Sequence, residues 1–144
     1  MSQANVELIL GLYQAPDVDY VPLYRDESLW AEQAEALAPF VHADFECVWY
    51  QFGNERRYSG VDGLRDFMLD WTAPWVTYRV ETEEAIDLGE RVLLLNHDHG
   101  CREGSMHEVR GRVAAVFSIR DGKITRLDAY LTRAEALDAV GLER

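Results

Sequence analysis

Residues 91–131, which read RVLLLNHDHGCREGSMHEVRGRVAAVFSIRDGKITRLDAYL, decide the fold class. They contain three runs rich in apolar and β-branched residues, and each run is a predicted strand. The runs are 91–99, 106–119 and 124–131. The pairs Glu103-Gly104 and Asp121-Gly122 separate them, and such pairs favour tight hairpin turns. Consecutive strands joined by hairpins predict an antiparallel sheet.

The sequence before this stretch alternates between helical and strand patterns. Strands are predicted at 45–52 (FECVWYQF) and 77–87, and Gly53-Asn54 marks a turn. Apolar residues recur at helical spacing in three segments, which start near Val6, Ser28 and Val61. Residues 17–27 form a long connection between the first two helices.

Two serine or threonine motifs indicate where helices begin. Ser59-x-x-Asp62 and Thr132-x-x-Glu135 both resemble capping boxes, and Gly141 ends the short helix that the second one opens. No linker or internal repeat interrupts the chain, so residues 1–144 are predicted to form one domain. The order of elements predicts an α+β fold, with helices on one face of a curved antiparallel sheet.

Composition excludes several classes of partner. The 144 residues include 14 Lys and Arg against 26 Asp and Glu, a net charge of −12. An acidic surface of this kind repels phosphate backbones and anionic lipid, so we expect neither nucleic acid nor a membrane as partner. Cys47 and Cys101 are too few for a disulfide framework and are predicted to be reduced thiols. Without a signal segment or an apolar run long enough to span a bilayer, we expect a cytoplasmic protein.

Four segments, in their order and spacing, are similar to those of one known family. They are HADFECVW (42–49), YSGVDGLRDF (58–67), IDLGERVLLL (86–95) and IRDGKITRLDAYLTRAEALDAVGL (119–142). Over nearly its whole length the chain resembles the SnoaL-like branch of the nuclear-transport-factor-2-like superfamily. The resemblance implies a cone, in which a strongly curved sheet wraps around N-terminal helices and leaves an apolar pocket at its open end. It also implies a homodimer that forms through the sheet, and residues 17–27 are an addition to the shortest members.

The strand at 91–99 carries the candidate catalytic residues Asp98 and Asn96. Because side chains alternate along a strand, these two share one face with Leu94, and His97 and His99 share the other. A register slip of one residue would exchange the two sets. A desolvated carboxyl gains a higher pKa and is suited to acid–base chemistry, whereas a solvated or arginine-paired Asp98 would be structural only.

The resemblance assigns roles to these positions only in part. Asn96 and Asp98 fall where limonene epoxide hydrolases place an arginine and an aspartate, and the second aspartate of those enzymes falls on Ala129. The general base of ketosteroid isomerases falls on Trp49. The chain therefore keeps one member of the hydrolase triad and lacks the isomerase base.

Aromatic residues predict what the pocket binds. Trp49, Tyr58, Trp71 and Trp75 lie on the segments that frame the opening, and they are the candidate ligand-binding residues. A flat aromatic wall suits a small apolar ligand of polycyclic or terpenoid type. The alternative is that these rings belong to the core.

No cofactor or metal is expected from the sequence. Gly60-x-x-Gly63 lacks the lysine or third glycine of nucleotide-binding loops. His97, His99 and Cys101 share a strand face, but three ligands in a flat row on one strand cannot converge on a tetrahedral ion.

Three functions are compatible with these patterns. The first is a cofactor-independent isomerase, cyclase or hydrolase that uses Asp98 as its acid or base, assisted by Asn96 and Tyr58. The second is a binding module that holds an apolar ligand without chemistry. The third is an interaction role for the outer sheet face.

Overall fold

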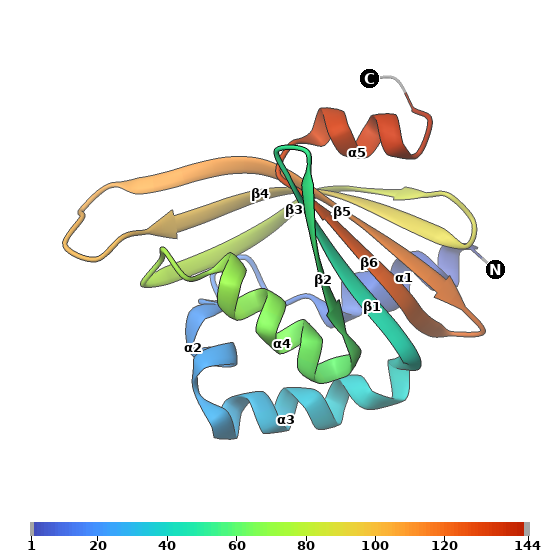
Figure 1. Cartoon of the computed structure of the whole chain (residues 1–144), viewed down its shortest axis with the longest axis horizontal. Coiled ribbons are helices and arrows are strands. Elements are labelled where there is room, and N and C mark those ends of the chain that lie inside the picture. The colour runs from blue at the N-terminus through green and yellow to red at the C-terminus, as the bar shows by residue number, and fades with distance from the viewer. Residues whose placement is uncertain (1, 143–144) are drawn as a thin grey trace.

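The computed structural model describes residues 2–142, which form one six-stranded mixed sheet with helices on both faces (Figure 1). The spatial order is β2-β1-β6-β5-β4-β3, and every neighbouring pair is antiparallel except β1 and β6. The strands are β1 (Val41–Gln51), β2 (Asn54–Ser59), β3 (Thr77–Asp87), β4 (Arg91–Cys101), β5 (Glu108–Arg120) and β6 (Lys123–Tyr130).

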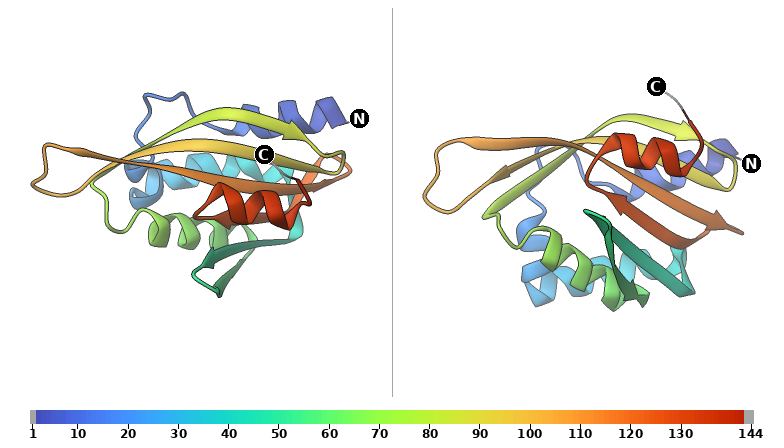
Figure 2. Two further views of the ribbon diagram at one scale, coloured as in Figure 1. Left: turned by 90° about the horizontal axis from the view of Figure 1, so that it is seen from above. Right: turned by 45° about the horizontal axis from the view of Figure 1, so that its top comes forward.

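The helices divide between the two faces of the sheet. They are α1 (Ser2–Leu12), α2 (Val21–Arg25), α3 (Glu27–Leu37), α4 (Gly60–Trp71) and α5 (Arg133–Ala139), with a 3₁₀ turn η1 (Ala38–Phe40) before β1. Helices α1 to α4 lie against one face, called the inner face here, and α5 lies against the other, the outer face (Figures 1 and 2). The prediction of helices on a single face is therefore wrong for α5, and the prediction of an antiparallel sheet is wrong for β1 and β6, which pair in parallel. None of the helices within residues 2–142 is long and apolar enough to cross a membrane.

The predicted strands and the longer helices are confirmed, and two short elements were missed. Residues 17–27 contain α2, which has a proline in its first turn. Strand β2 has no apolar alternation because all its side chains except that of Tyr58 are exposed. It pairs with β1 through a tight turn in which Phe52 and Gly53 both have positive φ, 48° and 83°.

Only one of the two predicted capping boxes forms. The Thr132 hydroxyl accepts a hydrogen bond from the backbone nitrogen of Glu135 at 3.3 Å, as predicted for α5. Ser59 precedes α4 but makes no capping hydrogen bond with its side chain. Asp26, which the sequence analysis did not single out, caps α3 by accepting from the backbone nitrogens of Ser28 and Leu29.

Separate apolar layers cover the two faces. On the inner face, Ile9 of α1 and Phe67 of α4 pack against strand residues such as Leu94 and Phe117. On the outer face, Ala136 of α5 packs against Leu93, and this layer covers only part of the sheet.

The sheet is open and twisted, with β2 and β3 as its two edges, rather than curled into the strongly curved cone that the resemblance implied (Figures 1 and 2). Register irregularities interrupt β1, β3 and β5 at Val41/Glu46, Thr82/Glu84 and Ser118/Ile119. Each irregularity bends one strand locally, and the two edges are not drawn together.

Candidate functional site

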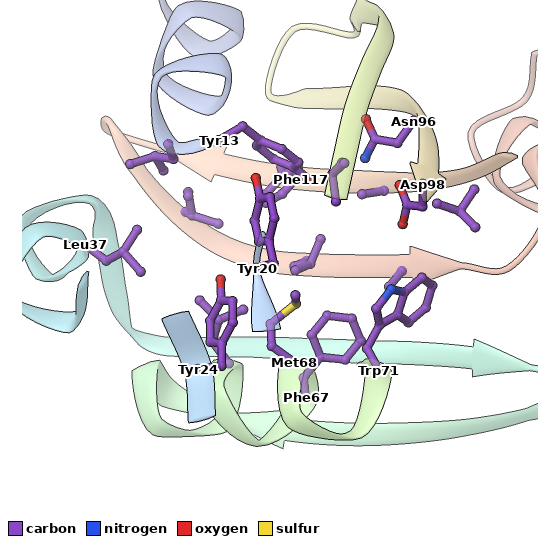
Figure 3. A pocket seen from close by; sticks show the side chains of 18 of the residues that line it. Tyr13, Tyr20, Tyr24, Leu37, Phe67, Met68, Trp71, Asn96, Asp98 and Phe117 are labelled. Atoms are coloured by element: carbon purple, nitrogen blue, oxygen red, sulfur yellow. The ribbon is translucent and has the colours of Figure 1, made fainter. Parts of the chain in front are cut away.

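A cavity of about 140 Å³ lies between the inner face of the sheet and the helices (Figure 3). Most of its lining is apolar and comes from α4, β1, β5 and β6. The lining side chains with polar groups are Tyr13, Tyr20, Tyr24, Gln33, Tyr78, Asn96 and Asp98. Such a mixture, apolar walls with a few polar groups, is typical of small-molecule sites.

Asp98 and Asn96 reach this cavity because β4 has the register that the sequence favoured. Leu94, Asn96 and Asp98 lie on the inner face, and His97 and His99 lie on the outer face. Asp98 is 6% exposed and Asn96 is 4% exposed, so both polar side chains are buried in the fold.

Two aromatic residues hold the Asp98 carboxylate. The Tyr78 hydroxyl donates a short hydrogen bond to Asp98 Oδ2, and Trp71 Nε1 donates to the Tyr78 oxygen at 2.7 Å. Asp98 Oδ1 is buried and has no hydrogen-bond partner within residues 2–142. One carboxylate oxygen is therefore fixed, and the other is a buried acceptor without a partner in the described chain.

Burial raises the pKa of the Asp98 carboxyl to about 7. The hydrogen bond from Tyr78, the Trp71 indole and the Arg133 charge all lower this pKa, but by less than burial raises it. A carboxyl with a pKa near neutrality can both accept and donate a proton at physiological pH, which is the condition for efficient general acid–base catalysis.

Asn96 and Tyr13 bring polar groups to the same part of the cavity (Figure 3). Asn96 Oδ1 accepts a hydrogen bond from Thr82 Oγ1 at 2.9 Å, which leaves the amide NH₂ group to donate to Tyr13. Burial raises the pKa of Tyr13 although a hydrogen bond with Asn96 lowers it, so the hydroxyl stays protonated. Both groups are therefore hydrogen-bond donors.

The connection between α1 and α2, residues 13–20, crosses the end of the cavity and is fixed to β3. Asp19 Oδ1 accepts from the backbone nitrogens of Tyr78 and Val21, both at 2.9 Å. The backbone nitrogen of Tyr20 donates to the Tyr78 carbonyl at 2.7 Å. The connection is therefore hydrogen-bonded to β3 at Tyr78, the residue that also donates to Asp98. It contributes Tyr13 and Tyr20 to the cavity lining.

Of the four predicted ligand-binding aromatics, the structure places Trp71 in the lining. Trp49 packs against Trp71, with ring centroids 5.3 Å apart, and is not part of the lining. The Tyr58 hydroxyl donates to Asp70 Oδ2 at 2.7 Å, outside the lining. Trp75 packs on Gly100, where a Cβ atom would lie 2.7 Å from the indole ring. For these last three residues, contact with a ligand stays a prediction.

Sequence reasoning missed the role of Tyr78 and the tyrosines before and within α2. A signal for Tyr78 was present, because Tyr78 and Val80 alternate with polar residues and so must face the core. Connecting Tyr78 with Asp98 also requires the register between β3 and β4. For Tyr20 and Tyr24, the helix α2 has five residues, too few for the spacing of its apolar residues to indicate a buried face.

Comparisons with known proteins agree with this fold. The family model of the SnoaL-like domain matches residues 23–127. A putative SnoaL-like polyketide cyclase from Jannaschia sp. CCS1 is 14% identical with a TM-score of 0.68, over 99% of this chain and 95% of that one. TerC co-crystallised with polyporic acid is 18% identical with a TM-score of 0.65, over 96% and 98% of the two chains.

An LEH-like epoxide hydrolase from M. tuberculosis is 16% identical with a TM-score of 0.56, over 96% of this chain and 90% of that one. At these identities the similarity shows a shared fold, and the reaction is a separate question. No curated protein sequence matches the chain. The family model covers most of the chain, from α2 to β6. The chain therefore belongs to the SnoaL-like domain family.

Proposed function

We propose that the cavity is the active site of a cofactor-independent enzyme that transfers a proton on a small apolar substrate, with Asp98 as the acid and base. The observation that carries the proposal is that the two oxygens of the Asp98 carboxyl group differ in their hydrogen bonds. Oδ2 is held by Tyr78, and buried Oδ1 has no protein partner in the described chain. An unpaired buried acceptor is costly, and this cost supports a role for Asp98 beyond packing.

The simplest chemistry for this arrangement is proton transfer next to a carbonyl. Asp98 Oδ1 takes a proton from the carbon beside the carbonyl, and the electron pair of that C–H bond moves onto the carbonyl oxygen as an enolate. Asn96 and Tyr13 are placed to donate hydrogen bonds to that oxygen. The protonated Asp98 then returns the proton to a conjugated carbon, which isomerises the double bond without a cofactor, or to the same carbon, which exchanges that hydrogen with solvent.

The size of the cavity narrows the substrate class. A buried apolar cavity of about 150 Å³ accepts a molecule such as benzene, and the cavity here is about 140 Å³. We therefore favour a substrate with a single ring, such as a monocyclic terpenoid or cyclic ketone. A polycyclic substrate would require the side chains of the lining to move apart.

The second candidate is a binding module without chemistry. It is supported by two positions at which the chain lacks the catalytic residue of the families it resembles. Trp49 stands where ketosteroid isomerases have their general base, and Ala129 stands where limonene epoxide hydrolases have their second aspartate. In this case the cavity binds the same apolar ligands, and Asp98 contributes polarity alone.

The test measures binding and proton transfer separately on the full chain. Quenching of tryptophan fluorescence by a panel of one-ring ketones, enones and epoxides measures binding. Proton transfer is then followed as deuterium incorporation from heavy water beside the carbonyl, and as conjugation of a β,γ-unsaturated cyclohexenone. We expect Asp98→Asn to lower turnover by about 10²- to 10⁴-fold, the usual contribution of a general acid or base, with little change in binding.

Asp128→Asn is the matched control. Asp128 is also buried and also accepts from a tyrosine, Tyr50 at 2.8 Å, but it lies outside the cavity lining and pairs with Arg126. This variant should retain turnover even where it loses stability. Turnover that is unchanged in Asp98→Asn would overturn the enzymatic proposal. Binding without turnover in the wild-type chain would favour the binding module.

A further inference from the structure

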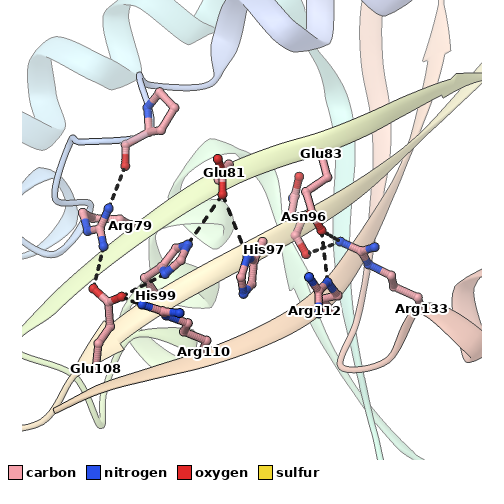
Figure 4. Close-up of polar contacts among 11 residues, drawn as sticks. Arg79, Glu81, Glu83, Asn96, His97, His99, Glu108, Arg110, Arg112 and Arg133 are labelled. Atoms are coloured by element: carbon pink, nitrogen blue, oxygen red, sulfur yellow. Dashed lines mark hydrogen bonds and ion pairs between the residues drawn. The ribbon is translucent and has the colours of Figure 1, made fainter.

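A cluster of side chains that can bind metal ions lies on the outer face of the sheet (Figure 4). His97 and His99 project from β4 on the face opposite Asp98. Glu81 of β3 is directly paired with His97 in the sheet register. The ligand atoms of these three residues lie within 4.8 Å of one another.

The geometry of the cluster is close to that of a metal site. Glu81 Oε1 is 3.7 Å from His99 Nε2 and 3.9 Å from His97 Nδ1. Ligands about 2.1 Å from a tetrahedral zinc ion stand about 3.4 Å apart, so both distances from the carboxylate to the imidazoles are within about half an ångström of that spacing. Sequence reasoning argued against a metal because a row on one strand cannot converge. Glu81 removes that objection because it approaches from the neighbouring strand.

Glu108 fixes the orientation of one histidine. Its Oε1 atom lies 3.0 Å from His99 Nδ1 and accepts a hydrogen bond from it, which directs Nε2 toward Glu81. Glu108 is itself held by Arg79 at 2.5 Å and by Arg110 at 3.3 Å. A carboxylate that orients a histidine in this way is the usual support of a zinc ligand.

Glu81 is also free of competing cations within the described chain. Its ion-pair partners among residues 2–142 are the two histidines. The nearby arginines are engaged elsewhere, Arg79 and Arg110 with Glu108 and Arg112 with Glu83. The chain carries a net charge of −12, which favours the approach of a cation.

We propose that Glu81, His97 and His99 form a binding site for one divalent transition-metal ion of the zinc type. The site has three protein ligands, which leaves one position of a tetrahedral ion for water or for another ligand. Imidazole and carboxylate together suit zinc better than magnesium or calcium, which prefer oxygen ligands alone. The site is separate from the proposed reaction at Asp98, because the two lie on opposite faces of β4.

The test is titration of the metal-free full chain with Zn²⁺ by calorimetry, with Co²⁺ absorption to report tetrahedral coordination. We expect one ion per chain in the wild type. Glu108→Gln should weaken binding by about 10- to 100-fold, the usual effect of losing such a support. Glu81→Gln, His97→Ala and His99→Ala should each weaken it at least as much. His107→Ala is the matched control, because His107 is an exposed histidine outside the cluster and should leave affinity unchanged.

Folding of each variant is checked by urea unfolding, and Glu81→Gln keeps the test decisive because Glu81 is half exposed and the change preserves its shape. Wild-type binding weaker than millimolar would overturn the proposal. An equal loss of affinity in His107→Ala and His97→Ala would do the same, because the ion would then bind histidines without regard to the cluster.

Discussion

The chemistry of Asp98 depends on how few groups surround it. Desolvation opposes its charge, and the donors that reach it, Tyr78 and Trp71, are neutral. Had an arginine paired with it, as Arg126 pairs with Asp128 at 3.0 Å, the carboxylate would stay ionised and fully satisfied. The two buried aspartates thus differ in one feature: Asp128 is paired with an arginine, and Asp98 has no such pair in the described chain.

The raised pKa of Asp98 predicts a particular dependence of stability on pH. Between about pH 4 and pH 7 the unfolded chain has released this proton while the folded chain still holds it, because the pKa rises from 3.8 to about 7 on folding. The free energy of unfolding therefore falls as pH rises through this window, by up to about 1.4 kcal/mol per pH unit, and this group has no further effect above it. In urea unfolding, Asp98→Asn should gain stability relative to the wild type on going from about pH 5 to pH 8. A difference that is the same at both pH values would contradict the assignment.

Tyr78→Phe tests the hydrogen bond that fixes Asp98 Oδ2. Because the hydroxyl stabilises the charged carboxylate, its loss should raise the pKa of Asp98 further above 7. Carbon-13 NMR of the aspartate carboxyls measures this directly, and the pH profile of any turnover should move in the same direction. Tyr58→Phe is the control, since that hydroxyl binds Asp70 outside the cavity and its loss should leave the pKa of Asp98 unchanged. A lower pKa in Tyr78→Phe would show that the hydroxyl does not donate to Asp98.

At the level of elements, one irregularity in β3 determines which side chains meet. Near the turn, Asp87 pairs with Val92, and continuing that register would place Glu81 opposite Asp98. Instead the register shifts between Thr82 and Glu84, and Val80 lies opposite Asp98. The shift adds one residue and reverses which face each β3 side chain occupies.

Both candidate sites depend on this shift. It turns Tyr78 inward to Asp98 and turns Glu81 outward to His97 and His99. Glu83, the residue skipped by the pairing, is held by Arg133 of α5 and by Arg112 at 3.3 Å. Figure 4 shows this contact beside the histidine cluster.

This irregularity also explains how far the sequence could predict the site. Alternation within β4 placed Asp98 and Asn96 correctly, because one strand is enough to determine it. The partners Tyr78 and Glu81 lie on another strand, and nothing in the stretch from Thr77 to Asp87 marks the extra residue. Strand β2 was missed for a related reason. It forms because it pairs with β1, and its own side chains are mostly exposed.

Two glycines in helices should respond in opposite ways to substitution by alanine, because one of them contacts a neighbouring strand and the other does not. A Cβ atom on Gly63 would lie 2.9 Å from the Tyr58 carbonyl carbon, which is backbone and cannot rotate away. Gly63→Ala should therefore destabilise the fold by about 1–3 kcal/mol, as overpacking does. Gly11→Ala, in α1, meets nothing within 4 Å and should be neutral or stabilise by up to about 1 kcal/mol. Urea unfolding of both variants measures this, and a stabilising Gly63→Ala would mean that α4 can move away from β2.

At the level of the whole molecule, the two faces of the sheet have different roles. The inner face and helices α1 to α4 enclose the cavity, and the family model begins at Leu23, after Tyr13 and Tyr20. Part of the cavity lining therefore lies outside the matched domain. That part is a place where substrate preference can differ between family members of the same fold.

The outer face is where a second copy would bind in the dimer that the resemblance implies. Helix α5 covers its apolar part, and the remainder carries exposed charges such as Arg110 and Arg112, whose side chains are 65% and 61% exposed. Exposed ion pairs within one chain contribute little to its stability, about 0–1 kcal/mol each, so they can be exchanged for pairs between two copies related by a two-fold axis.

Because such contacts are screened by salt, the dimer should depend on ionic strength. We expect sedimentation equilibrium at a micromolar concentration of the chain to give the mass of two chains at about 0.1 M salt and a shift toward one chain at about 1 M. A mass of one chain at low salt would contradict the dimer, and a dimer that resists high salt would place its interface on an apolar surface instead.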